Sequence, residues 1–241
     1  MSRPVIDLNG PKGRIVDAAL ALATVRPWRA VSLRDIAERA GMDLVGMRAH
    51  FASKADVLSA FVRAVDDAVL ASLDGLVHED PKRDQLFEIV MARFDALAPY
   101  KTALRSISAD LSADPALIRA HIASQAWMLE AAGIGADGIE GGMRVAGLAA
   151  VYASVYRTWL ADDDPGQART MAALDRRLRR GERTLQTLDG VAAGVRGLAD
   201  RLGGLMGSAG GRASAGMNSP SGAAGAGGDP EQGADGSTRA V

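Results

Sequence analysis

The sequence predicts an all-α protein, and three observations support this prediction. Apolar residues recur at spacings of three and four along most of the chain, as expected for helices that bury one face. No stretch alternates apolar and polar residues in the way that a half-buried strand does. Alanine and leucine dominate the apolar positions, and clear breaks between the apolar runs mark where helices end.

Helix boundaries follow from capping residues and from these breaks. Ser32 with Asp35, and Ser53 with Asp56, each have the spacing of a capping box, and Asp43 is a further N-cap candidate. The expected helices, in chain order, are residues 12–25, 32–41, 43–50, 54–77, 85–97, 100–111, 115–131, 139–160 and 165–180.

The chain divides by composition into five expected regions. A flexible N-terminus (1–11) precedes a compact three-helix unit (12–60) and a larger helical domain (61–182). In the last helix of that domain, Asp164 is the expected cap and Pro165 the first helical residue. An apolar stripe predicts an amphipathic helical extension (183–206), which packs on the bundle, pairs with a second subunit or lies on a membrane. The Gly/Ala/Ser-rich tail (207–241) is expected to be disordered.

Length and composition exclude several classes of protein. At 241 residues and 25.0 kDa, with 48% hydrophobic and 24% charged residues, the chain is long and apolar enough for one or two helical cores. The absence of cysteine excludes disulfides, thiolate zinc sites and cysteine nucleophiles. No apolar run reaches the roughly 20 residues of a membrane span, and the start lacks the apolar core of a secretory signal, so a cytoplasmic location is expected.

Charge is distributed unevenly along the chain. The net charge is only −1, but residues 1–60 hold nine Lys/Arg and six Asp/Glu, a net of +3. A modest basic excess therefore lies in the three-helix unit, as expected for a segment that meets a polyanion.

The segment 32–51 has the outline of a helix-turn-helix: two short helices joined by a turn that contains Gly41. Gly41 tolerates the left-handed backbone that other residues resist. Seven apolar residues are expected to face one small core, namely Leu33, Ile36, Ala37, Ala40, Met42, Met47 and Phe51. The opposite side of the second of these helices is then free to enter a DNA major groove.

With these motifs, residues 12–60 resemble the DNA-binding domain of the TetR family of transcriptional regulators. The residues that carry the resemblance are the segment SLRDIAERAG (32–41), Met42-Asp43, His50-Phe51, Ser53-Lys54 and Leu58. The resemblance implies that the helix starting at Asp43 is the recognition helix and that Lys54 touches a DNA phosphate. The expected DNA-contacting residues are Ser32, Arg34, Asp43, Leu44, Val45, Gly46, Arg48, His50 and Lys54.

The chain departs from the family pattern at three positions of the expected recognition helix. Arg48 stands where the family usually has an aromatic residue, and Leu44 and Val45 stand where small or polar residues are usual. Arg48 is expected either to replace a phosphate contact or to read guanine bidentately. Leu44 and Val45 offer apolar contacts, such as those to thymine methyl groups.

In TetR-like proteins the rest of the chain binds a small molecule and dimerises, which implies an unknown small apolar effector here. Aromatic and methionine side chains are expected either to line its cavity or to pack as ordinary core: Phe94, Tyr100, Trp127, Met128, Tyr152, Tyr156 and Trp159. Helices 139–160 and 165–180 are the expected homodimer interface. The expected partner is double-stranded operator DNA with near-palindromic symmetry, and repression is the family's habit.

Two other classes of function are an enzyme and a lipid-binding accessory protein. An enzyme is disfavoured, since the histidines lack metal-ligand spacing and the G-x-G-x-x-G match at 133–138 follows a helical run rather than a strand. No metal site and no cofactor are expected. The C-terminal half, from Trp127 through WLADDDP (159–165) to LDRRL (174–178), also distantly resembles the lipid-binding accessory proteins of ubiquinone biosynthesis, which are built on a TetR-like fold and contact membranes. That alternative relies on the apolar Leu44-Val45 pair and on the stripe in 183–206.

Overall fold

The structure is a computed structural model, and it describes residues 5–7, 9–73, 80–110 and 114–181. The chain divides into two compact units, Met1–Leu188 and Asp189–Val241, and all of the described residues belong to the first. The regions expected at 183–206 and 207–241 lie outside the described residues, as do the ends of the expected helices 54–77 and 100–111.

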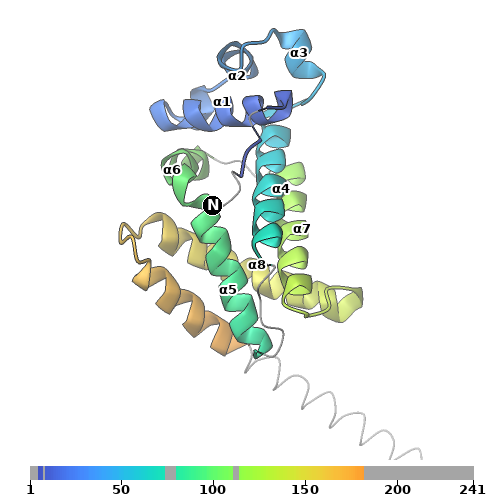
Figure 1. Cartoon of the computed structure of the whole chain (residues 1–241), viewed down its shortest axis with the longest axis vertical. Helices are drawn as coiled ribbons and strands as arrows, with labels where there is room; N and C mark the ends of the chain where they lie inside the picture. Colours follow the sequence, from blue (N-terminus) through green and yellow to red (C-terminus); the bar gives the residue numbers. More distant parts are fainter. Residues whose placement is uncertain (1–4, 8, 74–79, 111–113, 182–241) are drawn as a thin grey trace, which may run out of the picture. The chain divides into compact units, whose positions relative to one another are not determined.

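The described residues form helices joined by short turns and contain no strand, which confirms the predicted all-α class (Figure 1). The elements are α1 (Pro11–Val25), η1 (Trp28–Ala30), α2 (Leu33–Arg39), α3 (Leu44–Arg48), α4 (Lys54–Ser72), α5 (Lys82–Leu97), η2 (Ala98–Tyr100), α6 (Lys101–Asp110), α7 (Pro115–Ala131) and α8 (Gly138–Leu160). Residues 168–181 are also helical and are drawn in orange after α8.

The caps expected at the N-terminal helices are present. The Ser32 hydroxyl accepts from the Asp35 N–H and the Asp35 carboxylate accepts from the Ser32 N–H, a complete capping box on α2. Asp43 Oδ1 accepts from the Gly46 N–H at 2.7 Å and starts α3. The Ser53 hydroxyl accepts from the Asp56 N–H at 3.1 Å and starts α4. These local bonds satisfy helix N-terminal donors, which explains why the sequence predicted the starts closely.

Two helix starts differ from the prediction by three residues, whereas the others lie within one residue of it. α5 begins at Lys82 rather than 85, because the Pro81 carbonyl accepts from the N–H groups of the next turn and so places the charged residues inside the helix. The last helix begins at residue 168 rather than 165. Asp164 accepts from the N–H of Gly166 and of Ala168, and Gln167 has a φ of 52°, so a tight turn precedes the helix. Pro165 is therefore in that turn.

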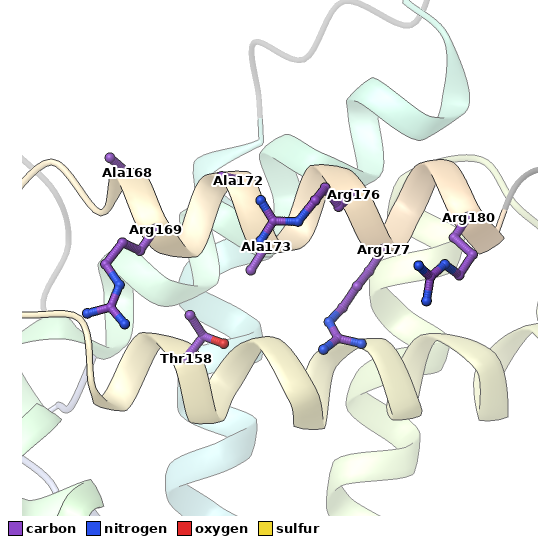
Figure 2. Close-up of a pocket in the computed structure, with 8 residues that line it drawn as sticks. All are labelled: Thr158, Ala168, Arg169, Ala172, Ala173, Arg176, Arg177 and Arg180. Carbon is purple, nitrogen blue, oxygen red and sulfur yellow. The ribbon is translucent and has the colours of Figure 1, made fainter.

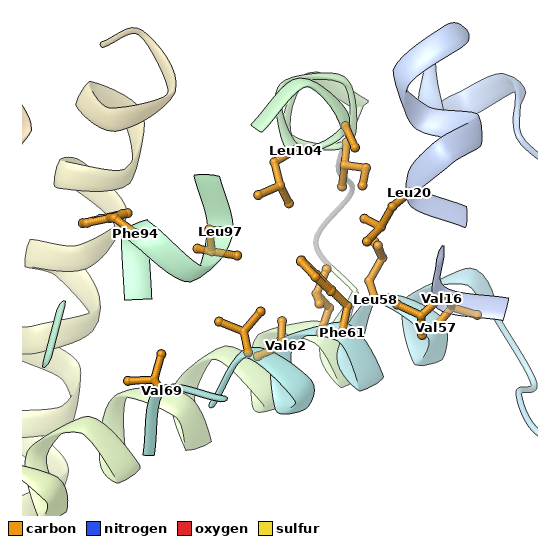
Figure 3. Close-up of a cluster of buried hydrophobic side chains, with 14 of the residues drawn as sticks. Val16, Leu20, Val57, Leu58, Phe61, Val62, Val69, Phe94, Leu97 and Leu104 are labelled. Atoms are coloured by element: carbon orange, nitrogen blue, oxygen red, sulfur yellow. The ribbon is translucent and has the colours of Figure 1, made fainter. Parts of the chain in front are cut away.

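α4 organises the core (Figure 3). Its apolar face carries Val57, Leu58, Phe61, Val62 and Val69, all buried. The first of these side chains meet α1, whose Val16 and Leu20 are labelled in the same view, and the later ones meet α5, α6 and α7. α4 thus runs without a break through the domain boundary that the sequence placed between residues 60 and 61, and it belongs to the cores on both sides.

Candidate nucleic-acid interface and ligand cavity

α2 and α3 are held together by one small apolar core. Ile36 and Ala37 of α2, Met47 of α3 and Phe51 after it are buried, as the helical spacing predicted. The other expected members, Leu33, Ala40 and Met42, are partly buried and pack against them. Gly41 adopts a φ of 72°, the left-handed region that glycine favours, and so lets the chain turn between the two helices.

The outer face of α3 is exposed. Val45 is 78% exposed and Leu44 is 42% exposed, and Arg48 is exposed one turn further on. Asp43 is exposed but uses its carboxylate to cap α3, and Gly46 lies against that carboxylate, since an added Cβ would be 3.2 Å from Asp43 Oδ1. The expected contacts on α3 therefore form one accessible surface with two apolar side chains and one cation.

The side chains of the remaining expected DNA-contacting residues differ in how exposed they are. Ser32 and Arg34, at the start of α2, are exposed, and His50, which follows α3, is half-buried. Lys54 is half-buried, and its ammonium points into the protein. It donates to the carbonyls of Trp28 and Val31 at 2.9 and 2.7 Å, and lies 4.6 Å from the centre of the Trp28 ring.

Lys54 therefore has a structural role that the sequence did not reveal. Two of the three ammonium donors are taken by the carbonyls of Trp28 and Val31, and this joins η1 to the N-terminus of α4. Burial lowers the pKa of the Lys54 ammonium. Long-range contacts of this kind leave no local pattern in the sequence.

The turn between α1 and α2 is bound to α6. The Asp110 carboxylate accepts from the backbone N–H of Arg29 at 3.1 Å and pairs with the Arg29 guanidinium at 2.9 Å. The Ser106 hydroxyl donates to the Arg26 carbonyl at 3.3 Å. Both bonds join residues some 80 positions apart in the chain, so they connect the three-helix unit with the bundle.

Side chains of α4 to α8 line a partly open cavity of about 410 Å³. This lies within the range of about 300 to 1,000 Å³ that small-molecule sites in proteins occupy. Its walls are mainly apolar, with side chains such as Phe61, Leu104 and Ile107. Polar groups enter at a few points, among them Arg93, His121, Gln125 and Tyr152.

A buried ion pair joins Arg93, which lines the cavity, to Asp66, which is not among the lining residues. Arg93 is only 2% exposed, and its guanidinium donates to the Asp66 carboxylate and, at 3.1 Å, to the Tyr152 hydroxyl. Asp66 also accepts from the Ser124 hydroxyl at 2.7 Å. Burial opposes the charge of Arg93, but Tyr152 and Asp66 outweigh it, so its pKa is raised. Each charge therefore has a hydrogen-bonded counter-charge, which buried ions require.

The expected ligand-contacting residues are spread over different environments. Tyr152 and Tyr156 line the cavity. Phe94, Met128 and Trp159 are buried in the core, with Phe94 stacked on Tyr152 and on Trp159, and are not among its lining residues. Tyr100 packs edge-on against Phe61. Trp127 is 58% exposed.

The polar residues in and next to the cavity wall were not among those singled out from the sequence. Asp66, Arg93, Ser124 and Gln125 belong to no motif, and their partners lie on other helices. One signal was available, because Asp66 stands on the apolar face of α4 between Val62 and Val69. A carboxylate in an apolar helical stripe needs a partner, and this indicates a buried polar site.

A second hollow lies between α8 and residues 168–181 (Figure 2). Arginine side chains extend from the helix 168–181 into and around it, and Arg177 reaches toward α8, which contributes Thr158. The residues lining this groove include Arg169, Arg176, Arg177 and Arg180. This surface is strongly basic.

Within residues 5–7, 9–73, 80–110 and 114–181, no cluster of three His, Asp or Glu side chains is arranged to hold a metal ion. Among the helices of those same residues, none has the length and apolar character to span a membrane.

Comparison with known proteins identifies the three-helix unit. Residues 15–61 match the family described as bacterial regulatory proteins, tetR family. A curated relative, the HTH-type transcriptional repressor KstR2 of Mycobacterium tuberculosis, is 30% identical over 98 residues, which cover 40% of this chain and 49% of the relative. The chain thus spans about half the length of the curated relatives it matches. Both curated relatives are named as transcriptional repressors.

Solved structures share the fold over a longer range. A TetR transcriptional regulator from Nitrosomonas europaea is 25% identical, covers 70% of this chain and 96% of its own, and superposes with a TM-score of 0.56. A TetR transcriptional regulator from Rhodococcus sp. RHA1 is 21% identical, covers 68% and 93%, and superposes with a TM-score of 0.51. The second likeness concerns the fold alone. Residues 15–61 therefore match the tetR family of bacterial regulatory proteins, and the chain's helical fold is similar to that of a solved TetR transcriptional regulator.

Proposed function

We propose that the protein is a TetR-type DNA-binding transcriptional regulator, a ligand-responsive repressor that acts as a homodimer on a near-palindromic operator. The observation that carries the proposal is the outer face of α3. Met47 anchors that helix inward while Leu44, Val45 and Arg48 stay exposed, so a short helix presents side chains to a groove. The family match at residues 15–61 and the repressor relative support the same function.

Each exposed group has a distinct role in this proposal. Arg48 contacts a phosphate or a guanine edge, and Leu44 and Val45 contact thymine methyl groups. Ser32 and Arg34 contact the backbone from the start of α2. Lys54 first holds η1 against α4, and its third N–H remains for a phosphate at the positive end of α4.

DNA binding by purified protein tests the proposal. A fragment from upstream of the protein's own gene should bind, with affinity falling steeply between about 50 and 200 mM salt as phosphate contacts release counterions. Arg48→Ala should weaken binding by roughly 1 to 3 kcal/mol, about 5- to 150-fold. Arg119→Ala is the matched control, since Arg119 is an exposed arginine on α7. Equal affinity of both variants, or no salt-sensitive binding, contradicts the proposal.

Lys54→Ala should weaken binding to all DNA sequences and lower the melting temperature of the protein. The second effect follows because Trp28 and Val31 lose the donor to their carbonyls. The two effects separate when affinity is compared at a temperature where the variant is folded. A variant with wild-type stability and weaker binding would assign Lys54 to phosphate alone.

A homodimer through α8 and residues 168–181 is supported by unpartnered small and apolar residues on one face of α8. Met143 is 59% exposed, and Gly142, Ala146, Gly147 and Ala150 are also exposed. Small residues let two helices approach closely, and a four-helix interface of this kind is self-complementary. In a dimer, the two α3 helices would meet half-sites about one turn of DNA apart.

Sedimentation of two charge-introducing variants tests this interface. Ala150→Glu should shift the protein from dimer to monomer and weaken operator binding, because it places two carboxylates in the interface. Ala123→Glu is the control, since Ala123 is equally exposed but lies on α7. A dimer that survives Ala150→Glu and dissociates with Ala123→Glu would place the interface elsewhere.

The lipid-binding alternative makes the opposite predictions. It expects tight liposome or isoprenoid-lipid binding and no salt-sensitive DNA shift. The named relatives are regulators, which favours the DNA-binding proposal.

A further inference from the structure

The cavity in the bundle has chemistry that restricts which effector it accepts, and this inference rests on the proposed function of a ligand-responsive regulator. The first restriction is charge. Among the described residues that line the wall, the buried cation is Arg93, and it is already neutralised by Asp66, which is further held by Ser124. A ligand carboxylate placed beside Arg93 would have to compete with Asp66, and the cavity would gain an uncompensated negative charge.

The other titratable groups of the wall do not supply a compensating cation. Burial lowers the pKa of His121, so its imidazole is neutral at pH 7. Burial raises the pKa of Tyr156 to about 12 and that of Tyr152 above its ordinary value, so both phenols keep their protons. Asp114, at the start of α7, adds a negative charge to the lining.

The second restriction is hydrogen bonding. Gln125 is 1% exposed, and its amide nitrogen donates to the His121 carbonyl at 3.3 Å, which orients the amide. Among the residues that the structure describes, its Oε1 accepts no hydrogen bond. His121 Nδ1 lies 2.9 Å from the Leu117 carbonyl, which requires Nδ1 to donate and leaves Nε2 as an acceptor. Two neighbouring wall residues thus offer acceptors, which a ligand with a donor satisfies.

We propose that the effector is an uncharged, mainly apolar molecule with a hydroxyl group, that the hydroxyl donates to the amide oxygen of Gln125, and that the carboxylate of the same skeleton is excluded. The balanced Asp66–Arg93 pair sets the charge preference. The unpartnered amide oxygen of Gln125 sets the preference for a donor. Asp66, Arg93 and Gln125 all lie outside the set of residues that the sequence singled out.

Three probes of one chain length test the proposal on the full chain: decan-1-ol, decan-2-one and decanoate. Binding is measured by calorimetry at pH 8, below micellar concentrations and without DNA. The alcohol should bind at least fivefold more tightly than the ketone and at least tenfold more tightly than the carboxylate. Decanoate binding as tightly as decanol would overturn the charge argument. Equal binding of alcohol and ketone would overturn the hydroxyl argument, and failure of all three to bind would overturn the proposal as a whole.

Two variants test the named residues. Asp66→Asn keeps the shape and an acceptor but leaves Arg93 without a counter-charge, so decanoate should gain at least tenfold relative to decanol. Gln125→Leu should abolish the preference for alcohol over ketone while ketone affinity is kept, and Ser108→Ala, at another hydroxyl on the wall, should preserve it. An unchanged ranking in Asp66→Asn or Gln125→Leu contradicts the proposal. Where a variant does not fold, the three probes on the wild-type chain still decide it.

These results are independent of the DNA experiments. Probe affinity is measured on the protein alone, so a cavity that rejects all three probes leaves salt-sensitive DNA binding untouched. A protein that binds decanol but no DNA would support the ligand class and contradict the proposed regulator.

Discussion

Asp35 joins three groups at the start of α2. Its carboxylate accepts from the Ser32 N–H at 2.8 Å and from the Ser32 hydroxyl at 2.7 Å, and pairs with the Arg26 guanidinium at 2.9 Å. These interactions, led by the Ser32 hydroxyl, lower the pKa of Asp35 from 3.8 to about 2. The folded protein therefore favours the ionised carboxylate more than the unfolded chain does.

The lowered pKa predicts how stability depends on pH. The contribution of Asp35 to stability is fully present above its unfolded pKa of 3.8 and is lost as the pH falls through about 2. Asp35→Ala should therefore lower the melting temperature at pH 6, and the gap to wild type should close between pH 5 and pH 2. Thermal unfolding followed by circular dichroism measures the gap. Glu38→Ala, on the exposed side of α2, is the control. A gap that stays constant down to pH 2.5 contradicts the assignment.

Residues with local partners were predictable from the sequence, and those with distant partners were not. Ser32, Asp43 and Ser53 act on backbone groups within three positions, so their types and spacing reveal them. Arg93 and Asp66 are 27 positions apart, and only the fold brings them together. Lys54 is also far in sequence from Trp28 and Val31, so the sequence did not indicate its two carbonyl partners.

At the scale of elements, the start of α8 depends on a close backbone approach. Gly141 lies so near the preceding loop that an added Cβ would be 2.1 Å from the Ala136 carbonyl carbon. Gly142, the next residue, has open space around its added Cβ. Two adjacent helical glycines therefore have opposite packing requirements.

This difference predicts opposite effects of two neighbouring substitutions. Gly141→Ala should destabilise the protein by about 1 to 3 kcal/mol, because the loop backbone has to move. Gly142→Ala should stabilise the fold of the single subunit by up to about 1 kcal/mol, because alanine favours the helix and meets no neighbour within its own subunit. Urea unfolding of both variants against wild type measures the two changes. Destabilisation by both, or by neither, would show that Ala136 does not restrict position 141.

Helix boundaries were predictable where a capping side chain acts within a single turn of the chain. The N-terminal helices begin within one residue of their expected starts, because Ser and Asp caps set them. The helix 168–181 begins late because Asp164 bonds two successive N–H groups and shapes a turn that composition alone does not distinguish from a helical start.

At the scale of the whole molecule, α6 contacts both the cavity and the turn that precedes α2. Leu104, Ile107 and Ser108 line the cavity, and Asp110, at the end of the same helix, holds the backbone of Arg29. A ligand that displaces α6 thereby moves the turn that precedes α2. This arrangement offers a physical connection between effector binding and DNA affinity.

Asp110 variants test that connection. Asp110→Ala should reduce the effect of decanol on DNA affinity several-fold while leaving decanol affinity unchanged, because the cavity residues are untouched and the bond to Arg29 is lost. Asp110→Asn keeps an acceptor for the Arg29 N–H and should retain more of the effect. DNA binding titrated with and without decanol measures the coupling. Full coupling in Asp110→Ala would mean that another contact transmits the signal.

The unbroken course of α4 has a mechanical consequence. A helix of 19 residues is about 28 Å long, since each residue adds about 1.5 Å. If it pivots as a rigid lever at the cavity end, a tilt of about 5° displaces its first turn by roughly 2 Å. Two subunits related by a dyad would add their displacements. In the proposed dimer, a change of a few ångströms in the separation of the two α3 helices would no longer match the helical repeat of DNA.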